Sequence, residues 1–510
     1  MKKTNFRWMI CSLLFFATTV NYLDRQVLSL TWKDFIAPEF HWTDADYGVI
    51  TGYFSLIYAF CNLFAGKFVD WMGTKKGYMW AIFIWSLAAC LHAFCGWGTF
   101  HLVDGVDSIA AMKALETGSA LALSVASVSV WLFLGCRCLL ALGEAGNFPA
   151  AIKVTAEYFP PKDRAFSTSI FNAGSSVGAL VAPATIPLIA EKFGWEMAFI
   201  IIGALGFVWM GFWQFLYKKP SENPRVNAEE LKYITEEVTQ RTENSEQRTV
   251  NSEQRTENSE QRTDAEVRSS SAAVGRDVLG APKEKGISYL KAFSLKQTWS
   301  LILGRVLTDG VWWFFLFWTP GYLSDQFGYK SSSGMGMALI VTLYAIVTFA
   351  SIYLCKIPTY MVEKKGMNPY EGRMVAMFLF ACFPLLALGA QPLGAVSAWF
   401  PAILIGFACA GHQAWSANIY SCVSDMFPKS CIGTLTGIAQ CAAGLGSFAI
   451  NICAGRLFTY AATKGDAFAF CGYTGKPAGY MIVFCYCAVA YIIGWACMKS
   501  LVPHYKKVEL

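Results

Sequence analysis

Charged residues are scarce in this chain of 510 residues. Asp, Glu, Lys and Arg together make up 15% of it, whereas 55% of the residues are apolar and 15% are aromatic. Soluble domains carry about a quarter charged residues. The shortage therefore argues against a water-soluble protein and indicates a chain that lies within a lipid bilayer.

Histidine is also rare, with five residues spread along the chain, and the 17 cysteines include no CxxC pair. Most of the cysteines lie inside apolar stretches, where they act as small hydrophobic residues. The sequence contains no His/Cys cluster with the spacing of metal ligands, and no nucleophile, base and orienting group at a recognisable spacing. We expect no metal, no cofactor and no enzymatic activity.

Apolar stretches long enough to cross a bilayer recur along almost the whole sequence. A helix needs about 20 apolar residues to span the hydrocarbon core. We expect an all-α membrane protein with twelve transmembrane helices, at residues 8–30, 46–68, 77–97, 122–144, 165–190, 196–217, 299–323, 334–356, 373–391, 397–420, 431–457 and 478–501. The first stretch contains Asp24 and Arg25 and lacks a cleavage site of small residues, so we interpret it as a retained span.

Basic residues outside the spans predict the orientation of the chain. Lys2, Lys3 and Arg7 precede the first span, and Lys506 and Lys507 follow the last. Because Lys and Arg close to span ends favour the cytoplasmic side, we expect a multi-pass protein of the inner, cytoplasmic membrane with both termini in the cytoplasm. The net charge of +6 therefore reflects topology and does not predict a nucleic-acid partner. We expect a monomer surrounded by lipid.

A polar segment, residues 218–297, separates the first six spans from the last six. Within it NSEQRT repeats three times between Asn244 and Thr263, with almost no apolar residue to form a coiled-coil seam. We expect a cytoplasmic linker, disordered in part, between an N-terminal bundle at 1–217 and a C-terminal bundle at 298–510. A partner-binding tail is the alternative interpretation of the repeats.

The two halves repeat a local motif. Glu157 and Phe159-Pro160 follow the fourth span, and Asp425 and Phe427-Pro428 follow the tenth, each before a glycine-rich span. The matching position indicates two parallel six-helix repeats. Repeats of this kind place a substrate site near the middle of the bilayer, between halves that move against each other.

Four charged residues lie inside the expected spans, where an ionisable side chain is costly unless it faces a partner or a cavity. They are Asp24 and Arg25 in the first span, and Arg137 and Glu144 in the fourth. Arg137 and Glu144 are seven residues apart and share one helix face, and an arginine fork fits a carboxylate. We therefore expect a site for a small organic anion and protons. A static charge network that braces the fold is the alternative.

The loop after the second span resembles the signature of the major facilitator superfamily. The segment Gly66-Lys67-Phe68-Val69-Asp70-Trp71-Met72-Gly73-Thr74-Lys75-Lys76 has its glycines, its acid and its basic pair in register. The resemblance implies the fold of that superfamily, with two six-helix bundles. It also implies a cytoplasmic gate in which Asp70 acts with basic residues, here Lys75 and Lys76.

Two further motifs resemble the anion:cation symporter family, namely Asn21-Tyr22-Leu23-Asp24-Arg25 and the segment from Arg137 to Lys153. Within that family, residues 143–149 and 309–320 are most similar to hexuronate transporters, which import glucuronate and galacturonate with protons. The resemblance implies that Asp24 and Glu144 take up protons and that Arg25 or Arg137 binds the substrate carboxylate. It also implies substrate-facing positions for Tyr58, Asn172, Ser175, Trp415, Ser416, Asn418 and Gln440. Gly310 departs from the proline usual in hexuronate carriers, and Gln440 from the asparagine of galactonate carriers.

Aromatic and polar neighbours complete the expected site. Asn21 and Tyr22 add hydrogen-bonding capacity beside the charges. Trp312 and Trp313 suit the apolar face of a sugar ring, with an interfacial aromatic belt as the alternative and as our expectation for Trp318. His412 is either a proton relay or a hydrogen-bonded core histidine, and we favour the core histidine.

We therefore expect a proton-coupled symporter that imports a sugar acid, with a hexuronate as the first candidate. A sodium-coupled or exchange carrier for another organic anion, such as galactonate or glucarate, is an alternative. A membrane sensor of the same fold that binds its ligand without transporting it is another.

Overall fold

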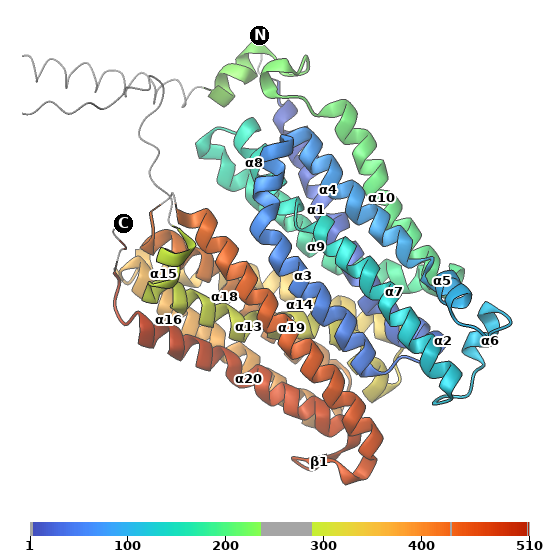
Figure 1. Ribbon diagram of the computed structural model, residues 1–510. Coiled ribbons are helices and arrows are strands. Elements are labelled where there is room, and N and C mark those ends of the chain that lie inside the picture. Colours follow the sequence, from blue (N-terminus) through green and yellow to red (C-terminus); the bar gives the residue numbers. More distant parts are fainter. Residues whose placement is uncertain (1–3, 236–287, 429–430, 507, 509–510) are drawn as a thin grey trace, which may run out of the picture.

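The computed structural model describes residues 4–235, 288–428, 431–506 and 508, which are almost entirely helical (Figure 1). The first half contains α1 (Phe6–Thr31), the π-helical turn η1 (Trp32–Ile36), α2 (Ala37–Phe40), α3 (Asp44–Met72), α4 (Thr74–His92), α5 (Cys95–Leu102), α6 (Ile109–Lys113), α7 (Ala120–Glu144), α8 (Asn147–Tyr158), α9 (Pro161–Phe193), α10 (Trp195–Leu216) and η2 (Pro220–Glu222). The second half contains α12 (Tyr289–Phe293), α13 (Lys296–Phe327), α14 (Gly334–Leu354), α15 (Ile357–Glu363), α16 (Pro369–Cys382), η3 (Phe383–Gly389), α17 (Ala390–Gly394), α18 (Trp399–Met426), α19 (Ile432–Lys464), η5 (Gly465–Ala467) and α20 (Gly475–Leu501). A short antiparallel hairpin, β1 (Ala469–Phe470) and β2 (Tyr473–Thr474), precedes α20.

Each expected span coincides with a helix or with consecutive helices in the described part of the chain. Ten of these helical segments are long and apolar enough to cross a bilayer, or eleven if α4 and α5, which are bent by 56° against each other, form one broken span. The tenth expected span coincides with α18, a helix of 28 residues that is not among those eleven. The helical membrane fold is confirmed, whereas the number twelve stays a prediction.

Local signals determine where the helices begin and end. Thr43 and Asp46 form a capping box at the start of α3, in which each side chain accepts a hydrogen bond from the other residue's backbone N–H. Gly73, with a φ of +78°, separates α3 from α4 in a conformation that suits glycine. Pro183 and Pro187 lie inside α9, where neighbouring helices surround the chain.

Two helical bundles lie side by side, one from each half of the chain (Figure 1). α3 of the first packs along α19 of the second, and α1 contacts α13. Glycines permit this approach, because a Cβ at Gly48 of α3 would meet the backbone oxygen of Asn451 at 2.6 Å. Small residues at such crossings are typical of helices that pack within a membrane.

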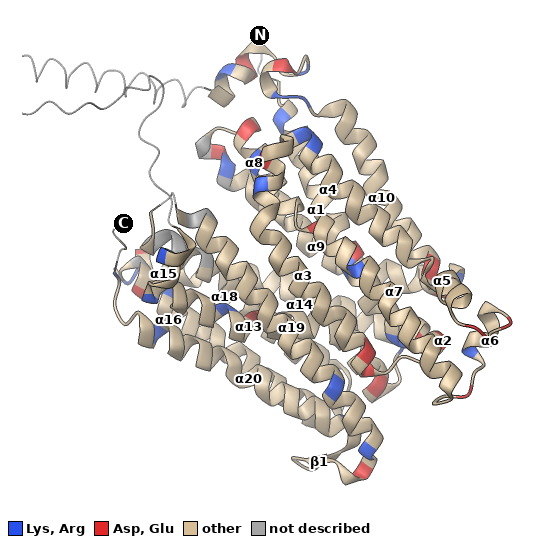
Figure 2. Ribbon diagram, in the orientation of Figure 1, with Lys and Arg blue, Asp and Glu red and all other residues tan. Residues whose placement is uncertain are grey.

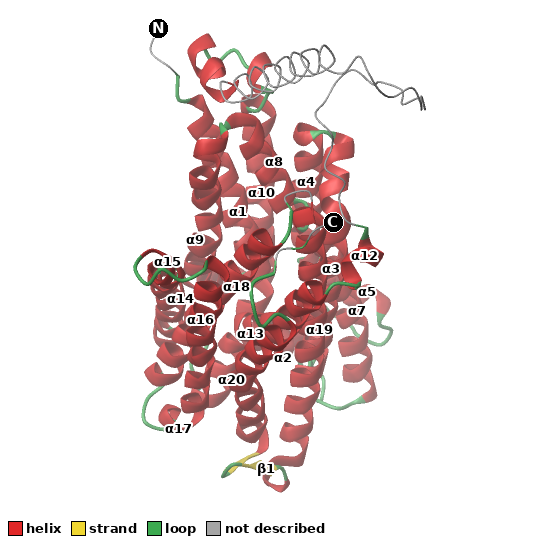
Figure 3. Cartoon of the chain, turned by 90° about the vertical axis from the view of Figure 1, so that its left-hand side faces the viewer, coloured by secondary structure: helices red, strands yellow, loops and turns green. Residues whose placement is uncertain are grey.

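Charged residues gather mainly at the two ends of the bundles (Figure 2). We call the end that carries the N-terminus the terminal end. The hairpin of β1 and β2 marks the opposite, far end (Figures 1 and 3).

The expected linker is described only at its flanks, where Glu230 accepts hydrogen bonds from the backbone N–H groups of Phe6 and Arg7 at the start of α1. The repeats between Asn244 and Thr263 lie outside the described residues.

Candidate functional site

Arg25 and Glu144, both predicted from the sequence, form an ion pair inside the N-terminal bundle. Nε and Nη2 of Arg25 donate to Oε2 of Glu144 at 3.0 and 2.6 Å, and the two side chains are 4% and 0% exposed. Glu144 ends α7, which approaches α4 closely because Gly143 has no side chain; a Cβ there would meet the backbone N of Trp85 at 2.5 Å. A buried ion pair of this kind is stable only while both partners are present.

Four aromatic rings surround the guanidinium of Arg25, and we call them the Arg25 cage. The guanidinium carbon lies 4.7 Å from the ring centroid of Tyr58, 4.9 Å from Trp313, 5.2 Å from Tyr22 and 5.9 Å from Phe54. Trp313 belongs to α13 of the C-terminal bundle, whereas the other three belong to the N-terminal bundle. The cage therefore joins both halves around one cation, in an arrangement that favours a positive charge.

Asp24, Arg137 and Asn21 lie close to this pair with unused polar atoms. Both carboxylate oxygens of Asp24, Nε and Nη1 of Arg137 and both amide atoms of Asn21 are buried without a hydrogen-bond partner among the described residues. Such atoms are expensive in an apolar interior. Two acids and two arginines make the cluster electrically neutral when all four are ionised.

The other expected substrate positions are distributed more widely. Ser175 donates to the backbone oxygen of Asn172 on α9, and Asn172 is exposed. Gln440 is half-buried on α19. The fully buried Trp415 packs edge-on against Tyr491 of α20 with ring centroids 5.5 Å apart, and Asn418 donates to the backbone of its own helix. Trp415 thus packs against α20 within the C-terminal bundle, and its role in substrate binding stays a prediction.

The expected gate has a different partner from the one implied by the sequence motif. Asp70 lies 2.7 Å from Lys153 of α8, and 72% of its side chain is exposed. Lys75 donates instead to the backbone oxygen of Gln214, and Lys76 is exposed. Helix geometry explains the difference, because α4 begins after Gly73 and carries Lys75 toward α10. A gating role for these residues stays a prediction.

A second buried charge pair lies in the C-terminal bundle and was missed from the sequence. Nη1 of Arg305 contacts both carboxylate oxygens of Asp309, at 3.0 and 2.9 Å, and Oγ of Ser416 at 2.8 Å. Arg305 and Asp309 are one turn apart on α13, so they neutralise each other locally. Their position inside the seventh expected span was the signal that could have revealed them. Ser416, expected to face the substrate, is held by this pair.

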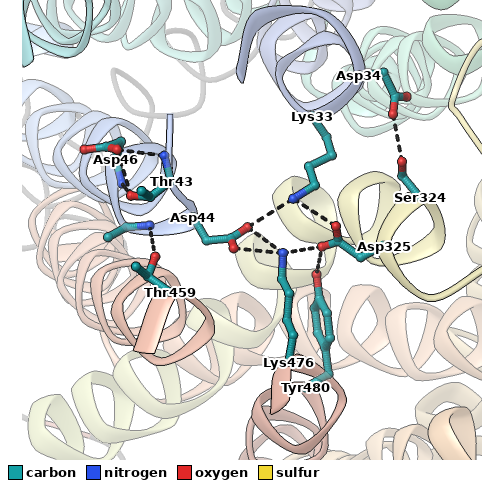
Figure 4. Close-up of polar contacts among 11 residues, drawn as sticks. Lys33, Asp34, Thr43, Asp44, Asp46, Ser324, Asp325, Thr459, Lys476 and Tyr480 are labelled. Atoms are coloured by element: carbon teal, nitrogen blue, oxygen red, sulfur yellow. Dashed lines mark hydrogen bonds and ion pairs between the residues drawn. The ribbon is translucent and has the colours of Figure 1, made fainter. Parts of the chain in front are cut away.

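Four charged residues close the far end between the bundles, and we call them the far-end clasp (Figure 4). Lys33 of η1 lies 2.8 Å from Asp325 of α13 and 3.6 Å from Asp44 of α3. Lys476 of α20 lies 2.8 Å from Asp44 and also contacts Asp325, which accepts a hydrogen bond from Tyr480. Each base thus touches one acid from each half.

Further contacts between the halves surround the clasp. Asp34 accepts hydrogen bonds from Ser324 and from the backbone and side chain of Ser331, at 2.7–2.8 Å. Trp318, expected in an interfacial belt, is instead fully buried, and its indole donates to Asn451. The expectation for Trp318 was wrong because its ring faces Tyr47 of the opposite bundle, at 5.0 Å. The far end is therefore closed by both charge and aromatic packing.

A membrane-spanning protein of two helical bundles, with a buried ion pair inside each bundle, has the form of a transport protein. Residues 14–450 match the sequence profile of the Major Facilitator Superfamily, and the chain belongs to that superfamily. It is accordingly a multi-pass membrane transporter and not an enzyme.

Among proteins of known annotation, the chain is similar to carriers of sugar acids. It is 25% identical to the hexuronate transporter of Escherichia coli K12 over 455 residues, 88% of this chain and 87% of the relative. It is 24% identical to a probable galactarate/D-glucarate transporter of the same strain over 472 residues, 92% of each chain. A galacturonate transporter of Dickeya chrysanthemi is 25% identical over 339 residues, 66% of this chain and 78% of the relative.

Solved structures of low identity share the fold. A bacterial homologue of the human lysosomal transporter Spinster, in an inward-facing and unoccupied conformation, has a TM-score of 0.62 at 16% identity, with 98% of each chain covered. A D-xylose–proton symporter has a TM-score of 0.62 at 13% identity, with 99% of each chain covered.

Proposed function

We propose that this protein is a proton-coupled symporter of the inner membrane that imports a sugar acid, with a hexuronate as the first candidate. The observation that carries the proposal is the buried ion pair of Arg25 and Glu144 inside a cage contributed by both halves. The arginine fork matches a carboxylate, and tryptophan and tyrosine rings suit the apolar face of a sugar. The names of the relatives support the same substrate class.

The charge balance of the site explains why protons accompany the anion. Asp24 and Glu144 neutralise Arg25 and Arg137 when all four are ionised. A monoanionic substrate would leave one uncompensated negative charge in an interior that does not tolerate it. One proton on either acid restores neutrality, so a hexuronate needs one proton, whereas a dianionic aldarate needs two.

The contacts of Arg25 and Asp24 set the order in which the proton and the substrate bind. Arg25 uses Nε and Nη2 on Glu144, so those donors are occupied while Glu144 is ionised. When Glu144 takes up a proton, its attraction for Arg25 weakens and the fork turns to the substrate carboxylate. Asp24 has no hydrogen-bond partner among the described side chains, so a proton removes an unpaired buried charge there. Loss of the proton on the cytoplasmic side returns Glu144 or Asp24 to competition with the substrate.

The far-end clasp determines which side of the membrane reaches the site. With both termini in the cytoplasm, the far end faces outward, and the clasp closes the path from outside. Substrate entry requires Lys33 and Lys476 to leave the acids of the opposite bundle, after which the halves separate at that end. The two bundles thus alternate about the Arg25 cage.

Uptake into proteoliposomes tests the proposal. The purified protein is supplied with labelled D-glucuronate, D-galacturonate, D-glucarate, D-galactarate and D-galactonate under an imposed proton gradient or an imposed sodium gradient. We expect the proton gradient alone to drive accumulation of at least one hexuronate. Accumulation driven by sodium contradicts proton coupling, and so does exchange without any accumulation under the proton gradient. Binding without any transport favours the sensor instead.

A further inference from the structure

The internal repeat relates a residue of the C-terminal bundle to Glu144. Phe159-Pro160 and Phe427-Pro428 are separated by 268 positions, and the same 268 positions separate Glu144 from His412. The packing agrees with this alignment. Gly143 approaches the backbone of Ala81 on α4, and Gly411, again 268 positions later, approaches that of Phe380 on α16, the corresponding helix of the second repeat.

The same comparison relates Trp312 to Arg25. Gly178 of α9 and Gly446 of α19 are also 268 positions apart. Each approaches a backbone oxygen of the first long helix of its own half, that of Thr19 in α1 and that of Val306 in α13. Thr19 and Val306 differ by 287 positions, as do Arg25 and Trp312. Trp312 therefore occupies the position on α13 that Arg25 occupies on α1.

The two related pairs make the same contact with different chemistry. Arg25 and Glu144 form an ion pair in the N-terminal bundle. Trp312 and His412 stack in the C-terminal bundle, with ring centroids 5.3 Å apart and ring planes within 7°. The C-terminal bundle thus carries a neutral aromatic contact at the place where the N-terminal bundle carries the Arg25–Glu144 ion pair.

Hydrogen bonding fixes the proton on His412. Tyr491 donates its single hydroxyl proton to the backbone oxygen of Thr308 at 3.0 Å, and its oxygen lies 2.7 Å from Nδ1 of His412. Because the tyrosine proton is already used, Nδ1 must carry a hydrogen and donate to Tyr491. In the neutral ring Nε2 is then a hydrogen-bond acceptor. The charged neighbour on this side is Arg305, itself paired with Asp309.

Nε2 of His412 is an unused acceptor on a residue that is 5% exposed. It has no hydrogen-bond partner among the described residues, and unlike Nε2 of His92 it is not fully enclosed. Trp312, on which the imidazole stacks, is followed directly by Trp313, whose ring contacts Arg25. The acceptor therefore lies next to the part of α13 that completes the Arg25 cage.

We propose that His412 is the substrate contact of the C-terminal bundle, where Nε2 accepts a hydrogen bond from a hydroxyl group of the sugar acid. The inference rests on the proposed function and adds the half of the site that recognises hydroxyls. Arg25 binds the carboxylate on one bundle, and His412 binds a hydroxyl on the other. A substrate that joins both contacts draws the bundles together, whereas a simple carboxylic acid does not.

Binding measurements on the full chain in detergent test this assignment. His412→Phe keeps an aromatic ring against Trp312 and removes the acceptor. Tyr491→Phe keeps His412 but removes the hydroxyl group that holds the imidazole hydrogen on Nδ1. We expect both variants to bind the preferred one of D-glucuronate, D-galacturonate and D-glucarate about ten-fold more weakly, the effect of one hydrogen bond. Binding of hexanoate, which has no hydroxyl group, should stay unchanged. His92→Phe, which replaces a histidine stacked on Phe199 in the other bundle, is the control.

The outcomes distinguish the role of His412 from the proposed function. Unchanged affinity for the sugar acid in His412→Phe and Tyr491→Phe overturns the role of His412 while leaving the proposed function intact. An equal loss for hexanoate and the sugar acid also overturns it, because hydroxyl recognition affects only the sugar acid. If the unmodified protein binds none of the three sugar acids, the proposed function itself is wrong.

Discussion

Lys476 of the C-terminal bundle lies 2.8 Å from Asp44 of the N-terminal bundle. With Lys33 and Asp325 the two residues form a closed set of alternating charges, in which every base contacts both acids (Figure 4). Removal of one acid therefore breaks one contact within a bundle and one between bundles. It also leaves two lysines facing a single carboxylate.

Asp325→Asn should open the far end. The variant removes the acid shared by Lys33 and Lys476 and leaves an excess positive charge between the halves. We expect faster backbone hydrogen exchange at the start of α3 and the end of α13, together with slower substrate uptake. Asp466→Asn is the control, because Asp466 lies near the same end and bonds to Thr474 of its own bundle. Exchange that matches the unmodified protein would show that the clasp does not hold the bundles together.

Arg25→Gln should be strongly destabilising on its own. It leaves Glu144 ionised and unpaired in a fully buried position, a change that costs about 3–5 kcal/mol of the free energy of unfolding. The double variant Arg25→Gln/Glu144→Gln should recover most of this loss, because neither charge remains. Thermal unfolding in detergent measures the stability of the single and the double variant.

Lys153→Gln provides the matched control for that experiment. Its ion pair with Asp70 has a similar length, 2.7 Å, but Asp70 is 72% exposed, so the loss should be about 0–1 kcal/mol. A double variant of Arg25 and Glu144 as unstable as Arg25→Gln would show that the loss does not come from an unpaired charge on Glu144.

Asp24→Asn should uncouple transport from the proton gradient. Wild-type uptake should fall as the external pH rises, because fewer protons are available to neutralise the buried acids. Asparagine is neutral at every pH, so accumulation driven by a pH gradient should be lost and the remaining pH dependence should be shallower. Exchange between equal substrate concentrations on both sides should persist. Asp104→Asn, in an exposed loop, should behave as the unmodified protein, and gradient-driven accumulation by Asp24→Asn would refute the assignment.

The sequence predicted the spans and the buried charges of the N-terminal bundle, because both depend on local properties. An apolar stretch of sufficient length predicts a span, and a charged residue inside it is recognisable as exceptional. Partners were not predictable in the same way, since Arg25 and Glu144 are 119 residues apart and meet only through the packing of α1 against its neighbours. Arg25 and Arg137 were both candidates from their positions in the spans, and the structure pairs Arg25 with Glu144.

The contacts of the far-end clasp could not be predicted from the sequence. Lys33, Asp44, Asp325 and Lys476 lie near the ends of their spans, where charged residues are common and expected to be in water. Nothing in their spacing indicates that the four meet, because the contact depends on how one bundle is placed against the other.

Gly444→Ala should disturb the crossing of α19 and α3. A Cβ at this position would meet the Cβ of Ala59 at 2.2 Å and the backbone oxygen of Ser55 at 2.8 Å, so the bundles must move apart. We expect a loss of about 1–3 kcal/mol in the free energy of unfolding and slower uptake. Gly135→Ala on α7 is the control, because a Cβ there meets nothing within 4 Å. Alanine is favoured over glycine within a helix, so Gly135→Ala should be neutral or slightly stabilising, and equal melting of the two variants would show that the crossing tolerates separation.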